Sequence, residues 1–441
     1  MMMDQQFEAR EYDDYLSNKL PALSAVGTRL SDLYYNLQNS SVEVLESTCN
    51  WSMKINLTST GFGSTNQINM PMSSFIGQLV LHLRLPAPTT NQSLCRGWGL
   101  NMIQRLRFQF GTSASTPIIL SKQAIWHALF SQCYTEEKRS AMFRLCGEQW
   151  TQPPLVPVGA DAVTYVDAYV PLPVPFSYLC EKLMYDSTIL GQPITVYLDF
   201  ETNPRLIYGG SDAVPTSFQQ AELMIRQQQL ADMSKSLRNI MQVDPSVLYS
   251  YPFTMALGFE TVGPFNGVRE SDGGQCTVQF NQFQNGDLLG IVFCVQAVGD
   301  ITPSSNNTPN PFHCDPIKNV SVTYNGGMIF QLPAQSYRAI ATYMGDQQDS
   351  SYWGSYVQSG AGPVFNSAPV QEYLIWLDFT NFRAICHQSH LSNDWRIPPG
   401  NVLQVAFNTQ FGSSTQYRCY YTTFYNSIVT AQGGVSNVWT A

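Results

Sequence analysis

The residues best suited to bind a metal lie in the segment CHQSH, which holds Cys386, His387 and His390, with Asp394 close behind. Thiolate sulfur and imidazole nitrogen at this spacing are ligands that zinc accepts. No second ligand pair stands nearby in the sequence, and the residues that follow are typical of a turn. We therefore interpret the segment as a polar loop after a strand.

Two pairs of carboxylates could act as the paired acids of a glycosidase. They are Asp161 with Asp167, and Asp199 with Glu201. Strand residues two apart share one face of a sheet, but such pairs more often belong to a solvated face than to an active site. We interpret both pairs as surface charges.

Other signatures of an enzyme are absent from the sequence. The motifs G-x-x-x-x-G-K, G-x-S-x-G and H-E-x-x-H do not occur, and the five histidines include no His-x-His pair of the kind that holds metal in cupins. His313-Cys314 lies in a Pro/Asn-rich loop. The aromatic run Tyr352–Tyr356 could stack on a sugar, but we favour a subunit contact because aromatic residues are enriched at interfaces. We predict that the chain is not an enzyme and has no catalytic, cofactor-binding or metal site.

The composition favours a protein that makes extensive protein contacts. At 441 residues the chain suits two domains of about 200 residues each. Only 12% of residues are charged, so uncharged polar groups must cover much of the surface, and these cost less to desolvate than ions. The net charge is −9 and no run of Lys or Arg exceeds two residues, which argues against direct nucleic-acid binding.

The sequence shows no signal peptide and no membrane-spanning run, so we expect synthesis in the cytosol or nucleus. The ten cysteines are scattered singly, with no C-x-x-C. Several lie in apolar, strand-like runs: Cys146, Cys276, Cys294 and Cys419. We expect buried thiols rather than disulfides in a reducing compartment.

A strand with one dry face is predicted from Phe75 onward. Its leucines, Leu79 to Leu85, fall on one parity, and polar residues fall on the other. Pro86 and Pro88 end the pairing, because proline cannot donate to a sheet ladder.

The two halves of the chain repeat this pattern. Segments from Phe75, Ile103 and Ile194 resemble segments from Asp287, Ile317 and Val402, in the same order and at offsets of roughly 205 to 215 residues. By contrast, the similar "YLDF" at Tyr197 and "WLDF" at Trp376 break the offset, and we treat them as coincidence.

A short amphipathic helix is predicted after the Gly-ended strand of each half. The apolar positions are Trp126, Leu129, Phe130 and Cys133 in the first half and Tyr337, Ile340, Ala341 and Met344 in the second. Ser121 is the expected N-cap of the first helix, and Pro333 suits the first turn of the second.

These patterns predict an all-β fold of two tandem eight-stranded antiparallel jelly rolls with short helices in the loops. The expected divisions are an N-terminal arm at 1–47, a first jelly roll at 48–212, a helical linker at 213–245 and a second jelly roll at 246–441. The linker rests on apolar residues at helical spacing: Leu223, Leu230, Met233, Leu237 and Ile240. In the acidic arm, Thr28 is expected to cap a helix that carries Leu30, Leu33, Tyr34 and Leu37.

The ordered segments resemble the double jelly-roll major capsid proteins, the lineage of adenovirus hexon and of virophage and nucleocytoplasmic large DNA virus capsid proteins. The similar runs are "INMPMSSFIGQLVLHLRLPA", "IKNVSVTYNGGMIF", "YLIWLDFTNFRAICHQSHLSNDWRI" and "YRCYYTTFYNSIVTAQGGVS", and the second half keeps a "GDL" at Gly286-Asp287-Leu288. The resemblance covers roughly residues 50 to 435, and the order of its motifs is the specific part.

The resemblance implies a homotrimer whose six jelly rolls form a pseudo-hexagonal capsomer of an icosahedral double-stranded DNA virus shell. It also implies neighbouring capsomers, penton proteins and minor or cement proteins as partners, with a place in the virion after synthesis in the host cytoplasm. One alternative is a carbohydrate-binding or hydrolytic double β-sandwich, which would need an aromatic platform or a catalytic carboxylate pair. A second alternative is a tandem single jelly-roll protein such as a fibre or spike, which would need a repetitive shaft or a secretory sequence.

Overall fold

The computed structural model describes residues 27–29, 53–70, 75–89, 91–111, 117–130, 136–147, 165–174, 185–186, 194–228, 248–261, 263–286, 288–301, 312, 314–315, 317–332, 375–378, 396–432 and 435–440. These residues form antiparallel sheets with a few short helices, which confirms the predicted fold class. One parallel pairing, between β1 (Gly27–Arg29) and β13 (Leu248–Glu260), adds to this plan.

The first half folds as two facing four-stranded sheets, which we name 1A and 1B. Sheet 1A has the spatial order β2 (Met53–Asn56), β12 (Gln220–Gln228), β4 (Phe75–Pro86) and β8 (Tyr165–Leu172), and β9 (Tyr185–Asp186) also pairs with β4. Sheet 1B has the order β3 (Thr65–Asn69), β10 (Ile194–Phe200), β6 (Ile103–Phe110) and β7 (Ile118–Ser121). A small ribbon of β5 (Gln92–Leu94) and β11 (Tyr208–Gly210) stands apart from both.

The second half repeats the plan with sheets 2A and 2B. Sheet 2A has the order β13, β21 (Gln416–Gln432), β16 (Leu288–Ala297) and β19 (Ile375–Asp378), and β14 (Phe265–Asn266) and β22 (Val435–Thr440) also pair with β21. Sheet 2B has the order β15 (Cys276–Phe280), β20 (Leu403–Thr409), β17 (Ile317–Tyr324) and β18 (Gly327–Leu332).

The strand order is the same in both halves. If the eight main strands of each half are numbered along the chain, the A sheets read first, eighth, third, sixth and the B sheets read second, seventh, fourth, fifth. The segments matched by sequence pattern occupy equivalent places: β4 with β16, β6 with β17, and β10 with β20. The predicted tandem repeat of jelly rolls is therefore confirmed.

The "YLDF" and "WLDF" segments are not equivalent. Tyr197 lies in β10, the seventh strand of its half, whereas Trp376 lies in β19, the sixth strand of the other half. Their likeness is a coincidence, as the broken offset predicts.

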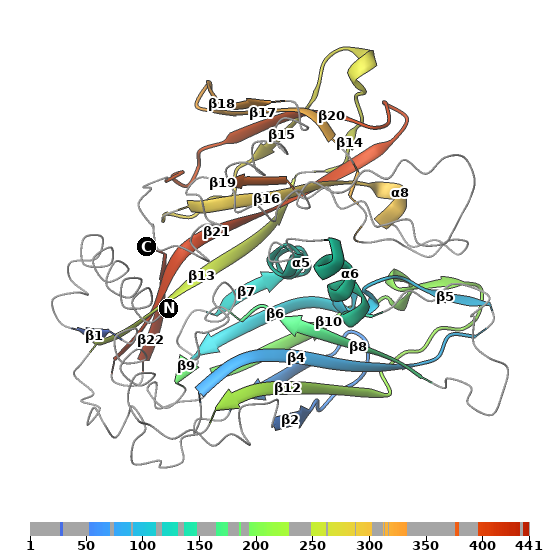
Figure 1. Ribbon diagram of the computed structural model, residues 1–441, viewed down its shortest axis with the longest axis vertical. Helices are drawn as coiled ribbons and strands as arrows, with labels where there is room; N and C mark the ends of the chain where they lie inside the picture. The colour runs from blue at the N-terminus through green and yellow to red at the C-terminus, as the bar shows by residue number, and fades with distance from the viewer. Residues whose placement is uncertain are drawn as a thin grey trace.

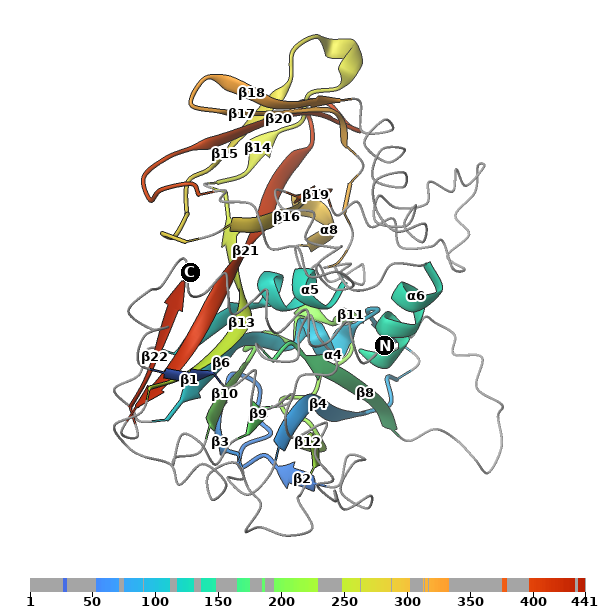
Figure 2. The ribbon, with the colours of Figure 1, turned by 60° about the vertical axis from the view of Figure 1, so that its left-hand side comes forward.

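The two halves stack in layers (Figures 1 and 2). Sheet 2B lies at the top, sheet 2A runs diagonally below it, α5 (Lys122–Phe130) and α6 (Glu136–Leu145) lie between the halves, and the first jelly roll lies at the bottom. One hydrophobic core fills the first jelly roll and continues into the junction, and a second fills the space between sheets 2A and 2B.

β4 and β16 show how this layering shapes the sequence. In β4 the leucines from Leu79 to Leu85 point into the first core while the alternate residues lie on the outer face, so the strand alternates as predicted. In β16 every residue is buried, because one face lines the second core and the other lies in the junction. A strand covered on both faces is expected to read as a continuous apolar run.

Several short helices lie in the connections between strands. Besides α5 and α6 the structure has α4 (Trp98–Asn101) and α8 (Val298–Ile301), with 3-10 turns at Pro204–Leu206 and Glu270–Asp272. The predicted first helix is confirmed as α5, and the Ser121 hydroxyl accepts a hydrogen bond from the backbone N–H of Ala124 at 3.3 Å, as an N-cap does. The equivalent helix predicted around Tyr337 to Met344 lies outside the described residues.

The predicted helical linker is wrong for residues 220–228. These residues form β12, which pairs with β2 and β4 and completes sheet 1A. Ala221, Leu223 and Ile225 point into the first core, a period of two that is typical of a strand. The other residues that suggested a helix, from Leu230 to Ile240, lie outside the described residues, and the remaining domain limits stay predictions.

The expected helix cap at Thr28 is also wrong. Gly27–Arg29 forms β1, whose residues pair in parallel with Leu248, Tyr249 and Ser250. The open edge of β13 supplies hydrogen-bond partners, so this piece of the arm adds a strand to sheet 2A. The apolar positions from Leu30 to Leu37 lie outside the described residues.

Candidate functional site

The junction of the two jelly rolls is built around α5. This helix follows β7 directly and contacts β6, β7 and β8 on one side and β13 and β21 on the other. Residues 124–130 of the helix are all buried, including Trp126, whose ring lies 5.2 Å from that of Phe312. A short helix that is apolar on all sides is expected to be enclosed by protein. The helix therefore holds the two halves in one relative position, because its buried side chains belong to a core that is continuous across the junction.

His127 is the polar centre of this junction. Its Nδ1 lies 2.6 Å from Oγ1 of Thr422 on β21, and its Nε2 lies 3.5 Å from Sγ of Cys294 on β16. All three side chains are buried. Because a buried polar group without a partner is costly, these contacts fix how α5 is seated on sheet 2A. We did not predict this contact from the sequence, although a histidine in an otherwise apolar helix was a usable signal.

β13 approaches α5 closely at Gly258. A Cβ atom at this position would lie 2.4 Å from Oγ of Ser121 and 2.8 Å from the backbone nitrogen of Ala124. Only glycine allows the helix N-terminus and the strand to pack at this distance.

The outer face of sheet 1A carries a charged network centred on Asp167 of β8. Arg84 binds this carboxylate with two hydrogen bonds, of 2.7 and 3.0 Å. His82 Nε2 lies 2.9 Å from the same carboxylate, and His82 Nδ1 lies 3.2 Å from Oε2 of Glu222 on β12. Burial raises the pKa of Asp167, but the hydrogen bonds from Arg84 and His82 outweigh it and hold that pKa below its ordinary value.

Two exposed tyrosines lie over this network. Tyr165 is 43% exposed and Tyr169 is 36% exposed. The Arg84 guanidinium stands 3.9 Å from the centre of the Tyr165 ring, and the Tyr169 ring stacks on His82 at 4.6 Å. The face therefore presents aromatic rings in fixed positions above charges that are already paired.

The second carboxylate pair is bound by three basic side chains, and Asp199 is buried rather than the surface charge expected from the sequence. Asp199 accepts hydrogen bonds from Arg105 at 2.8 Å and from Arg107 at 3.1 Å, while Glu201 forms an ion pair with Lys122. Burial raises the pKa of Asp199 but its hydrogen bonds, chiefly from Arg105, lower it by more. A glycosidase acid needs a raised pKa, so neither Asp199 nor Asp167 is tuned for that role. Asp161 lies outside the described residues.

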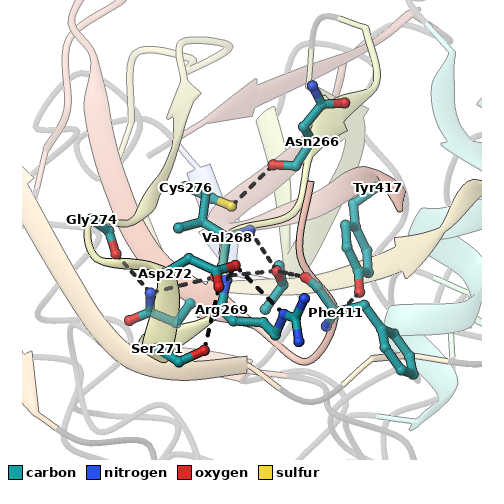
Figure 3. A network of polar contacts seen from close by, with 11 residues as sticks. Asn266, Val268, Arg269, Ser271, Asp272, Gly274, Cys276, Phe411 and Tyr417 are labelled. Atoms are coloured by element: carbon teal, nitrogen blue, oxygen red, sulfur yellow. Dashed lines mark hydrogen bonds and ion pairs between the residues drawn. The ribbon is translucent and has the colours of Figure 1, made fainter. Parts of the chain in front are cut away.

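Loops of the second jelly roll are tied together at one end of the sandwich (Figure 3). The backbone N–H of Val268 donates to Oγ1 of Thr409 at 2.9 Å, and that hydroxyl donates to the carbonyl of Phe411 at 2.7 Å. The N–H of Phe411 donates to the Tyr417 hydroxyl at 3.2 Å. This network fixes the backbone at Phe411, whose side chain is 50% exposed.

The described cysteines are buried thiols outside any disulfide, which confirms the prediction for them: Cys95, Cys146, Cys276, Cys294, Cys314 and Cys419. Burial raises the pKa of the Cys95 thiol to about 12 and also raises that of Cys419. Cys95 and Cys419 are therefore held as neutral thiols, which are poor nucleophiles and metal ligands. Cys294 differs: burial raises its pKa, but hydrogen bonds with Cys314 and His127 lower it by more, to about 6.

Several sequence candidates lie outside the described residues: Cys386, His387, His390, Asp394, His313 and the run Tyr352–Tyr356. Among the ranges described, no group of three or more His, Cys, Asp or Glu residues is arranged to hold a metal ion. Within the same ranges, no helix has the length and apolar character needed to cross a membrane.

Comparison with known proteins identifies the fold. No family model matches the chain, and no curated protein matches it by sequence. Solved structures do match it. VP54 of PBCV-1, fitted into a reconstruction of the virophage Sputnik, aligns over 88% of this chain and 96% of its own, with a TM-score of 0.60 and 10% identity.

Two major capsid proteins align at similar extent. The Faustovirus protein covers 85% of this chain and 89% of its own, with a TM-score of 0.54 and 11% identity. The mavirus protein covers 91% of this chain and 93% of its own, with a TM-score of 0.51 and 13% identity. The chain therefore has the double jelly-roll fold of viral major capsid proteins, over nearly the full length of each.

Proposed function

We propose that this chain is the major capsid protein of a double-stranded DNA virus. Three copies form a pseudo-hexagonal capsomer of six jelly rolls, and these capsomers tile an icosahedral shell. The observation that carries the proposal is the identical strand order of the two halves together with an alignment that spans most of the capsid proteins it matches.

The chemistry of the described surface agrees with a mechanical role. The carboxylates that could have served a glycosidase, Asp167 and Asp199, are bound by arginines and have lowered pKa values. The chain as a whole carries few charges and no basic cluster, so its partners are proteins rather than the genome. We propose neighbouring capsomers, penton proteins and minor or cement proteins as these partners, in the virion, after synthesis in the host cytoplasm.

The first test is the mass of the purified full chain. Size-exclusion chromatography with light scattering should give three times the 49.3 kDa of one chain, and electron microscopy should show particles with a hexagonal outline. A stable monomer over the whole accessible concentration range contradicts the proposal, and binding of such a monomer to a glycan array would favour a lectin instead.

A further inference from the structure

We propose that Lys122 and Asn101 join through a covalent isopeptide bond within the folded chain, with Glu201 transferring the protons. Asn101 is the last residue of α4, Lys122 is the first residue of α5, and Glu201 directly follows β10. The bond is a modification that the chain makes to itself, so it involves no turnover of a substrate. The inference does not depend on the proposed capsid function.

The contacts of Lys122 place its amine beside the carbonyl that it attacks and the base that it needs. Its Nζ donates a hydrogen bond to Oδ1 of Asn101 at 3.2 Å and forms an ion pair with Oε1 of Glu201. The Nδ2 of Asn101 donates to the carbonyl of Leu206 at 2.6 Å, which holds the amide with its oxygen toward the amine. The backbone N–H of Glu201 donates to the carbonyl of Met102 at 2.9 Å, next to Asn101 in the chain.

The distance still to be covered is short. Bond formation requires the attacking nitrogen and the carbonyl carbon to approach to about 3–3.5 Å. Nζ already contacts Oδ1, and Oδ1 is bonded to the carbon under attack, Cγ of Asn101. Lysine carries its amine on a flexible four-carbon stem, so a small rotation of the side chain is enough to bring the two atoms together.

The surroundings favour the neutral amine that the reaction needs. Asn101 is 1% exposed, and the side chains of Lys122 and Glu201 are 15% and 17% exposed. Burial lowers the pKa of the Lys122 ammonium by more than the nearby Glu201 raises it. A desolvated lysine is a stronger nucleophile than one in water. The neighbouring Cys95 does not compete, because burial raises the pKa of its thiol to about 12.

The reaction balances without an oxidant or a reductant. Glu201 takes a proton from the Lys122 ammonium, and the neutral Nζ attacks Cγ of Asn101. The bond between Cγ and Nδ2 then breaks while Glu201 relays a proton from the attacking nitrogen to the leaving nitrogen. The products are a secondary amide between the two side chains and one ammonium ion, and Glu201 returns to its carboxylate. One carboxyl group thus acts as both base and acid, as in general acid–base catalysis.

The bond would close the segment from Asn101 to Lys122 into a covalent loop. This segment contains β6 and β7, and its end is the start of α5, the helix on which the junction of the jelly rolls is built. A covalent link that closes a loop lowers the conformational entropy of the unfolded chain. The position of α5 on the first jelly roll would then be held by a covalent bond as well as by packing.

Mass spectrometry of the purified, denatured full chain tests the proposal. After folding and prolonged incubation, the mass should be lower than the sequence mass by one ammonia molecule. Trypsin cannot cut at an acylated lysine, so a branched peptide should join residues 97–105 to residues 108–138. The branched peptide distinguishes the bond from a cyclic imide at another asparagine, which also loses ammonia.

Glu201→Gln and Lys122→Arg should each keep their own sequence mass and yield no branched peptide, with folding checked by circular dichroism. The matched control is Lys318→Arg. Lys318 belongs to an exposed set of the same three residue types, with Glu270 at 3.6 Å and with Asn319, which donates to Glu270 at 3.1 Å. This variant should still lose ammonia as the wild type does.

A folded wild-type chain that keeps its full sequence mass overturns the proposal, and so does a branched peptide that forms equally in Glu201→Gln. Neither result bears on the capsid proposal, which the mass of the native assembly tests separately.

Discussion

The Nδ1 atom of His127 lies 2.6 Å from Oγ1 of Thr422, although the two residues are 295 positions apart and belong to different jelly rolls. This contact ties α5 of the first unit to the central strand β21 of the second. The position of one jelly roll against the other therefore depends on a buried contact within the folded chain.

Removal of the Thr422 hydroxyl tests this contact. In Thr422→Val the side chain keeps its size, but the buried Nδ1 of His127 loses its partner. We expect the free energy of unfolding in urea to fall by about 1–3 kcal/mol, the cost of an unsatisfied buried polar group. Thr277→Val, on the exposed face of β15, is the control and should change it by less than about 0.5 kcal/mol. Equal effects of both would mean that the junction contact contributes nothing.

Gly258 tests the close approach of β13 and α5. Gly258→Ala places a methyl group 2.4 Å from Oγ of Ser121, so the helix or the strand must shift. We expect a loss of about 1–3 kcal/mol in the free energy of unfolding, typical of overpacking. Gly299→Ala, where an added Cβ meets nothing within 4 Å, is the matched control and should not lower stability. A stable Gly258→Ala protein with unchanged packing would contradict this account.

The Asp167 network predicts a dependence of stability on pH. Burial raises the pKa of Asp167, but the Arg84 and His82 hydrogen bonds lower it by more, so the folded pKa lies below the unfolded one. A depressed pKa contributes stability above the unfolded value of about 3.9, and this is lost as pH falls through the folded value.

The variant Asp167→Asn removes this contribution. We expect its free energy of unfolding at neutral pH to be lower by about 1–3 kcal/mol. Below about pH 5, it should fall less steeply than that of wild type. Urea unfolding over a pH series measures both effects. Glu260→Gln, which breaks the exposed pair with Arg418, should differ little from wild type. If the free energy of unfolding of Asp167→Asn and of wild type changes with pH in parallel, the Asp167 network does not cause the pH dependence.

The N-terminal arm is expected to act in shell assembly rather than in trimer formation. Deletion of residues 1–46 removes β1, which adds only three residues to the edge of sheet 2A. We expect the trimer to remain by light scattering while capsid formation, seen by electron microscopy, is impaired. Deletion of residues 1–24 keeps β1 and should impair shells less. Loss of the trimer, or normal shells from the shorter chain, would show that the arm has another role.

The sequence by itself determined the repeat. The alternating leucines of β4, the continuous apolar run of β16 and the helical pattern around Trp126 depend on local periodicity, which each segment carries in its own residues. The same local signals failed at β12, because spacing that fits a helix over a long window also contained the strand pattern of Ala221, Leu223 and Ile225.

Only the tertiary structure decided which faces meet. Nothing near His127 in the sequence points to Thr422, and nothing near Asp167 points to Arg84 or Glu222, because sheet pairing brings together residues far apart along the chain. It likewise gave the outer faces of sheets 1A and 2A different roles, one exposed and one buried. The difference in burial between the two faces depends on where α5 lies between the halves. It is determined by contact across the junction and not by the periodicity of any strand.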